Sequence, residues 1–305
     1  MEEQQKKNSA TLGFLIDILR GMGIGVAFII PGFSGGSVAA ILGIYERLIT
    51  AIADVFKDFK TSLKTLIPIG LGMIIGAVAL LFPLKWALGS FPIPTVSLFV
   101  GLALGGIPSI TDKLKRERIS CSNVIAFIIP VAVVLSVAFM PIGTEKALLD
   151  LSLGGYALLF LIGVIGSAAL VIPGISGSML LLILGYYNPI VAIFTDHLLR
   201  GRDVMRSILV LGVTALGIAF GFLLISIIMK KLFAVCPRGT YFAILGFIIG
   251  SVPTIFISTA KEAGMSLSTL PTSALHWIFC VILLIIGFSL SYALIIYTRN
   301  QQKSE

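Results

Sequence analysis

Apolar residues form long blocks along this chain, and short polar or charged stretches separate the blocks. Ten blocks are apparent, and each is near the length of roughly 20 residues that a helix needs to span a bilayer. They cover residues 11–30, 34–53, 65–84, 92–110, 121–140, 152–172, 176–195, 206–228, 240–257 and 274–297. The pattern predicts an all-α polytopic membrane protein.

The blocks divide into two sets of five, because a motif in the first set recurs in the second. The stretch I-P-G-F-S-G-G-S at residues 30–37, the first tip, returns as I-P-G-I-S-G-S at residues 172–178, the second tip. Matched positions continue beyond the motif: Gly43 with Gly185, Tyr45 with Tyr187, Gly101 with Gly246, Gly105 with Gly250, and Pro108 with Pro253. The correspondence predicts an internal duplication of the whole unit.

We expect a first repeat at residues 1–145 and a second, inverted repeat at residues 146–305. Each repeat is expected to open with a re-entrant helical hairpin, at about 12–53 and about 152–195, and to continue with three transmembrane helices. The number of crossings per repeat is odd whether the first two blocks span separately or fold back. The second copy should therefore run in the opposite direction to the first.

The depth of the first tip follows from the charges that flank it. No charged residue lies between Arg20 and Glu46, and Pro31 lies near the middle of that interval. A helix from Arg20 to Pro31 rises about 16 Å, which is roughly half the hydrocarbon thickness. The tip is thus expected near the midplane, where irregular backbone must be buried in protein or line a polar cavity. With inverted halves, the two tips can meet.

Composition agrees with a membrane protein, since 57% of the residues are hydrophobic and 12% are charged, with a mean hydropathy of +1.08. The net charge of +8 lies in short loops and forms no single face, so it indicates topology and not nucleic-acid binding. Placing both termini in the cytoplasm, with an uncleaved N-terminus, puts most basic residues inside. These are Lys57, Lys60, Lys64, Lys113, Lys115, Arg116, Arg118, Lys230, Lys231, Arg238, Arg299 and Lys303, against Lys85, Lys146, Lys261, Arg200, Arg202 and Arg206 outside.

The two tips have the residue types of an anion site. A proline ends the first arm, glycines permit unusual backbone conformations, and serines begin the next helix, which leaves free N–H groups at a helix N-terminus. Such an end binds phosphate through directed donors and the helix dipole. The candidate residues are Pro31, Gly32, Ser34, Gly35, Gly36, Ser37, Pro173, Gly174, Ser176, Gly177 and Ser178. The alternative is that the motif only makes a tight turn and caps a helix.

Glu46 and Arg47 are further candidates, because they interrupt the apolar pattern after the first tip and their counterparts Asn188 and Pro189 are uncharged. Arg47 would bind the ligand head group, and Glu46 would accept a coupling proton. The alternative is that both side chains extend to the cytoplasmic interface. Asp17 and Arg20, one helical turn apart, are interpreted as an ion pair.

Enzymatic alternatives have less support. Residues 32–36 fit G-x-S-x-G, the serine-hydrolase motif, but that motif needs a preceding strand and a histidine base. The histidines, His197 and His276, lie far from it in the sequence, and the second tip departs from the motif. The three cysteines have no metal-binding spacing. The protein is not expected to be an enzyme.

The tip motifs, residues 31–36 and 173–178, resemble those of the bacterial polyprenyl-phosphate (undecaprenyl-phosphate) transporter family, formerly a domain of unknown function. The resemblance covers essentially the whole chain. It implies a flippase in the bacterial cytoplasmic membrane that recycles undecaprenyl phosphate, the carrier lipid of cell-wall synthesis, from the outer to the inner leaflet.

The expected partners are a polyprenyl-phosphate lipid and the bilayer, without nucleic acid, cofactor or metal; proton or sodium coupling and oligomeric state stay open. An isoprenoid tail can remain in lipid while only the phosphate crosses, so a shielded anion site between two rocking halves fits the task. A secondary transporter of a small soluble anion would use the same tips. A non-transporting scaffold or receptor is the second alternative.

Overall fold

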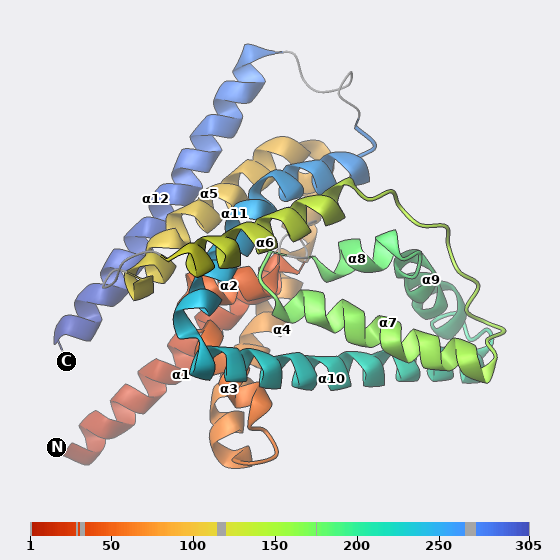
Figure 1. Cartoon of the computed structure of the whole chain (residues 1–305), viewed down its shortest axis with the longest axis horizontal. Helices are drawn as coiled ribbons and strands as arrows, with labels where there is room; N and C mark the ends of the chain where they lie inside the picture. The colour runs from red at the N-terminus through yellow and green to blue at the C-terminus, as the bar shows by residue number, and fades with distance from the viewer. Residues whose placement is uncertain are drawn as a thin grey trace.

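The computed structural model describes residues 2–28, 30, 34–114, 120–174, 176–265 and 273–304, and all regular structure in these ranges is helical (Figure 1). The elements are α1 (Glu2–Ala27), α2 (Gly35–Ile41), α3 (Tyr45–Ala53), α4 (Phe59–Ser90), α5 (Pro92–Thr111), the 3-10 helix η1 (Asp112–Leu114), α6 (Cys121–Phe139), α7 (Leu153–Val171), α8 (Gly177–Ile183), α9 (Tyr187–Ala192), the π-helix η2 (Ile193–Leu198), α10 (Val204–Val235), α11 (Pro237–Glu262) and α12 (Ala274–Ser304). The predicted all-α class is confirmed.

Within the described ranges, six helices are long and apolar enough to cross a membrane: α4, α5, α6, α10, α11 and α12. The apolar windows of α5 and α11 are 56% and 50% buried, whereas those of the other four are at most 22% buried. The helices α5 and α11 are therefore central, and the other four present apolar side chains outward. This arrangement is typical of a multi-pass membrane protein.

The same helix pairings occur in both halves of the chain. Helix α1 packs along α4 as α7 packs along α10, while α5 pairs with α12 and α11 with α6, so these last two pairs join the halves (Figure 1). Single residues with nearly the same backbone conformation connect α4 to α5 and α10 to α11: Phe91 (φ −139°, ψ 61°) and Cys236 (φ −140°, ψ 65°). These matches agree with a duplication; the direction of the second half in a membrane stays a prediction.

Glycines at matching positions bring the paired helices close together. A Cβ on Gly72 of α4 would overlap the Ile18 carbonyl oxygen of α1, and a Cβ on Gly217 of α10 would overlap the Phe160 carbonyl oxygen of α7. Burying apolar side chains provides little net drive between helices in lipid, so close backbone approach at small residues contributes to their association.

Two predicted blocks are wrong as single helices. The block 34–53 is divided into α2 and α3, and the block 176–195 into α8 and α9. Gly43 (φ +70°) and Gly185 (φ +79°) lie at the two breaks, and α8 is bent by 106° from the helical stretch Tyr187–Leu198. Glycine adopts positive φ without the steric cost of a side chain, which explains why both copies bend at this repeated position.

Several predicted loop residues, Lys85 and Lys230 among them, also lie in helices, because α4 and α10 are longer than expected. Lys85 was assigned to an outside loop but belongs to α4, and Lys230 was assigned to an inside loop but belongs to α10. A 32-residue helix extends about 48 Å, which exceeds the hydrocarbon core. Charged side chains near its ends can therefore reach water while the backbone stays helical.

We predict that Gly217→Ala will destabilise the protein, because the added methyl group must push α7 away from α10. The expected loss is about 1–3 kcal/mol, measured as a lower midpoint of thermal unfolding in detergent. Gly212→Ala is the matched control on the same helix, since nothing lies within 4 Å of its Cβ position. Equal midpoints for the two variants would contradict the close-packing interpretation.

Candidate functional site

Each tip joins a long helix to a seven-residue helix. Helix α7 ends at Val171, and Ile172 is extended (φ −69°, ψ 123°) because the residue before a proline disfavours the helical region. The short helices α2 and α8 then begin at Gly35 and Gly177. The predicted tip residues Pro31 and Gly32 lie outside the described residues, as do their neighbours at positions 33 and 175.

The two tips are in direct contact, although they are far apart in the sequence. The Gly174 N–H donates a hydrogen bond to Ser37 Oγ over 2.7 Å, and Ser34 Oγ donates to the Ile172 carbonyl oxygen over 3.3 Å. Ser34 and Ser37 are 3% and 1% exposed. Polar groups of each tip therefore satisfy polar groups of the other inside the protein.

Glycines permit this contact. A Cβ on Gly36 would overlap the Val171 carbonyl oxygen, and Gly174 combines a positive φ (+85°) with a Cβ position that would overlap the Phe247 carbonyl oxygen of α11. Any other residue at position 174 would be strained as well as crowded. The close contact between the tips thus depends on the absence of side chains at Gly36 and Gly174.

The serines act differently at the two helix ends. Ser176 begins α8 with its hydroxyl 3.5 Å from the Met179 N–H and 3.0 Å from Ser178 Oγ. Ser34 precedes α2 but makes no capping hydrogen bond, because its hydroxyl is directed to the second tip. The N–H groups of Gly35 and Gly36 donate no hydrogen bond to any described residue.

The expected helix dipoles are smaller than the sequence suggested. Because α2 and α8 contain seven residues each, they are much shorter than the blocks of about 20 residues that were predicted. Most of the field at a helix N-terminus comes from the first-turn N–H groups, which both short helices retain. The tips therefore provide the N–H donors of a first helical turn, without the dipole of a long helix.

A further contact ties the second tip to α3. The buried Tyr45 hydroxyl donates to the Val171 carbonyl oxygen over 3.0 Å. Its ring also lies edge-on to Phe233 of α10, with the ring centroids 6.0 Å apart. The sequence comparison paired Tyr45 with Tyr187 but did not identify this contact, because the role of a tyrosine hydroxyl depends on its tertiary neighbour.

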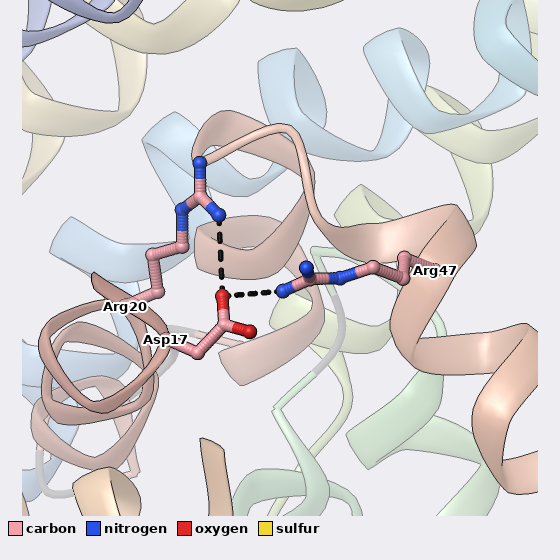
Figure 2. A network of polar contacts seen from close by, with 3 residues as sticks. All are labelled: Asp17, Arg20 and Arg47. Atoms are coloured by element: carbon pink, nitrogen blue, oxygen red, sulfur yellow. Dashed lines mark hydrogen bonds and ion pairs between the residues drawn. The ribbon is translucent and has the colours of Figure 1, made fainter. Parts of the chain in front are cut away.

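Arg47 does not join the tip serines, contrary to the expectation that it would add charge there. It forms an ion pair with Asp17 of α1, and Arg20 contacts the same carboxylate oxygen over 3.2 Å (Figure 2). The predicted ion pair of Asp17 and Arg20 is confirmed, and Asp17 is only 7% exposed. The sequence did not identify Arg47 as the third member because it comes from a different helix.

Glu46 is likewise directed elsewhere, since its carboxylate accepts a hydrogen bond from the Tyr241 hydroxyl of α11 over 2.9 Å. The histidines are also apart from the tips: His197 is 3.5 Å from Asp203, and the His276 ring lies edge-on to Trp277. Neither contacts a tip serine in the described part of the chain. The hydrolase alternative therefore gains no support from these positions.

Two cavities lie beside this assembly. A polar one of about 420 Å³ is lined by Glu46, Arg47 and side chains from the end of α3 and the start of α4. An open apolar one of about 590 Å³ is lined by α1, α2, α4, α5 and α12 and reaches the first tip at Ile30. Leu42 lines the apolar cavity and the next residue, Gly43, lines the polar one, so the two cavities approach each other at the end of α2.

Known proteins identify the family. A family model described as undecaprenyl phosphate translocase-like matches residues 24–269, which include both tips. The chain belongs to this family. A polyprenyl-phosphate transporter of Staphylococcus aureus (strain NCTC 8325 / PS 47) is 29% identical over 284 residues, which are 92% of this chain and 95% of that protein.

A polyprenyl-phosphate transporter of Vibrio cholerae serotype O1 (strain ATCC 39315 / El Tor Inaba N16961) is 29% identical over 126 residues, or 36% of this chain and 40% of that protein. No solved structure matches the chain. Membership in the family rests on sequence.

We predict that Ser37→Ala will destabilise the protein, because the buried Gly174 N–H would lose its acceptor. The expected loss is about 1–3 kcal/mol, read from denaturant or thermal unfolding in detergent. Ser136→Ala is the control, since the exposed Ser136 hydroxyl bonds only to the Val133 carbonyl oxygen of its own helix. A Ser37 variant as stable as the control would show that the tips do not hold each other.

Proposed function

We propose that this protein transports polyprenyl phosphate across the cytoplasmic membrane and binds the phosphate where its two tips meet. The observation that carries the proposal is the contact between the tips, made by Ser37 with Gly174 and by Ser34 with Ile172. Two serine- and glycine-rich helix ends at one buried point can supply several donors to one phosphate. The family match and the names of the two relatives support this substrate class.

The contact between the tips is a closed arrangement. Ser37 and Gly174 use their hydrogen-bonding groups on each other, so a phosphate must displace these bonds in order to bind. Separation of the tips would free the hydroxyls and the N–H group together. The closed contact then keeps water and ions out of the site when no lipid is bound, as a transporter requires.

An inverted pair of hairpins gives this site access from both sides of the membrane in turn. We infer that the first hairpin (α1, α2 and α3) and the second (α7, α8 and α9) enter from opposite faces, and that the halves rock about the tips. The matched packing of α1 with α4 and of α7 with α10 supports two equivalent bodies. The joined pairs α5 with α12 and α11 with α6 would couple their movements.

A lipid substrate is favoured over a small soluble anion by the apolar cavity of about 590 Å³ that reaches the first tip. A soluble anion has no use for an apolar chamber at its binding site, whereas an isoprenoid chain does. Undecaprenyl phosphate is the substrate that we propose, with transport from the outer to the inner leaflet. This direction returns the carrier lipid to cell-wall synthesis.

We predict that the Ser34→Ala/Ser176→Ala variant will transport prenyl phosphate about tenfold or more slowly than the unaltered protein in reconstituted vesicles. Each substitution removes a hydroxyl donor to a charged group, which is worth about 1.5–3 kcal/mol. The Ser120→Ala/Ser136→Ala variant, with two exposed hydroxyls removed, is the control. If a folded tip variant transported at the control rate, the phosphate site would have to lie elsewhere.

The inversion can be tested at one matched pair of positions. Lys60 and Arg202 lie 142 positions apart, as do Pro31 and Pro173. In a cysteine-free background, we predict that a membrane-impermeant maleimide will label Arg202→Cys on intact cells, and Lys60→Cys only after permeabilisation. Labelling of both positions from the same side would mean that the halves run in parallel.

A further inference from the structure

Two guanidinium groups share one carboxylate in the cluster of Asp17, Arg20 and Arg47, and Arg47 also lines the polar cavity together with Glu46, Asp54 and Asp58. Both guanidinium groups contact the same Asp17 oxygen, and neither makes another hydrogen bond to a described residue (Figure 2). Each guanidinium has five N–H donors, so most donors of the cluster are unused. The side chains of Arg20 and Arg47 are 25% and 46% exposed, which leaves them reachable by a ligand.

The fold does not need these charges for packing. The positions that match Asp17 and Arg20 in the second half are Leu159 and Ile162, which are buried in an apolar cluster with Val210 of α10. The α7 and α10 pair therefore forms with apolar residues where the α1 and α4 pair has a carboxylate and a guanidinium. Burying charge costs free energy, so retention of these groups in one copy indicates a ligand.

An apolar cavity begins beside this cluster and leads toward the first tip. One side of the cavity is formed by residues spaced four, three and four positions apart: Leu19, Gly23, Val26 and Ile30. This spacing places the first three on one face of α1, and Ile30 follows the end of that helix. Leu19 adjoins Arg20 in the sequence, and Ile30 begins the first tip. The part of the stripe within α1, from Leu19 to Val26, spans about 10 Å at helical rise. Apart from Ser291, the described lining of this cavity has no polar side chain.

We propose that Arg20 and Arg47 form a second phosphate site, held in place by Asp17, and that the adjoining cavity binds the first isoprene units of the same lipid. This inference rests on the proposed function and is separate from the tip site. Guanidinium groups bind phosphate oxygens through paired, charge-assisted hydrogen bonds, and an apolar chamber next to them matches an amphiphile with one charged end. Neither an inorganic phosphate nor a neutral isoprenoid alcohol uses both parts.

The position of this site gives it a place in transport. In the predicted orientation, the cluster lies toward the cytoplasmic interface, so the phosphate would reach it after the tips and leave it for the inner leaflet. The isoprenoid chain would move along the α1 side of the cavity during this step. The absence of matching charges in the second half makes the two ends of the route unequal, which suits transport with a preferred direction.

The binding test uses the purified full-length protein in detergent, titrated with farnesyl phosphate, farnesol or inorganic phosphate and followed by thermal shift. The unaltered protein is expected to bind farnesyl phosphate at least about tenfold more tightly than farnesol, because only the phosphate engages the arginines. Inorganic phosphate is expected to give no shift at the same concentrations. Equal affinity for inorganic phosphate and farnesyl phosphate would overturn the assignment of a lipid site.

Two variants separate the two parts of the site. Asp17→Leu/Arg20→Ile/Arg47→Leu copies the apolar solution of the second half at Leu159 and Ile162, so it leaves no unpaired buried carboxylate and should fold. It is expected to bind farnesyl phosphate about tenfold more weakly than the unaltered protein and farnesol equally well, because the tips still bind phosphate and only the arginine contacts are lost. Gly23→Leu projects into the apolar cavity and is expected to weaken both ligands about tenfold, with Arg200→Ala and Gly212→Leu as exposed controls.

The outcomes distinguish this inference from the function on which it rests. A folded charge-cluster variant that bound farnesyl phosphate as tightly as the unaltered protein would overturn the second site. If that variant also transported at the normal rate while the Ser34→Ala/Ser176→Ala variant did not, the tip site would stand alone. Failure of the unaltered protein to transport any prenyl phosphate would instead remove the proposed function itself.

Discussion

The structure depends on one constraint: non-helical backbone placed inside a membrane protein must find hydrogen-bond partners there. Each tip supplies the partners of the other, through Ser37 with Gly174 and Ser34 with Ile172. Neither tip would satisfy these groups by itself in lipid. The two halves are therefore bound together at the point where both helices are interrupted, and breaking this contact exposes donors and acceptors at one place.

Glycine determines how closely the elements around this point approach. The helix pairs α1 with α4 and α7 with α10 meet at glycines, and Gly36 and Gly174 remove side chains from the contact between the tips. Small residues serve two purposes in this protein, since they let helices associate in lipid and let backbone groups act as ligands. The absence of a side chain also explains why Gly43 and Gly185 can adopt a positive φ and bend the chain after each tip.

The halves share a plan but differ in chemistry. Charged side chains of α1 and α3 meet at Asp17, whereas the matching positions in α7 are apolar and buried. A symmetric scaffold supports reversal of access between two sides, and local asymmetry allows the two sides to bind a head group differently. In the transport that we propose, an amphiphile would meet a buried contact between the tips and a basic cluster at one end.

The sequence by itself determined the membrane class, the duplication and the residues of both tips, because hydrophobic block length and a repeated motif are local patterns. It did not reveal the bends at Gly43 and Gly185, since a glycine in an apolar block is compatible with a continuous helix. Only the tertiary structure decided that Arg47 meets Asp17, that Tyr45 meets Val171, and that the two tips bond to each other. These contacts join segments far apart in the chain, and their geometry follows from how helices pack, which no local pattern encodes.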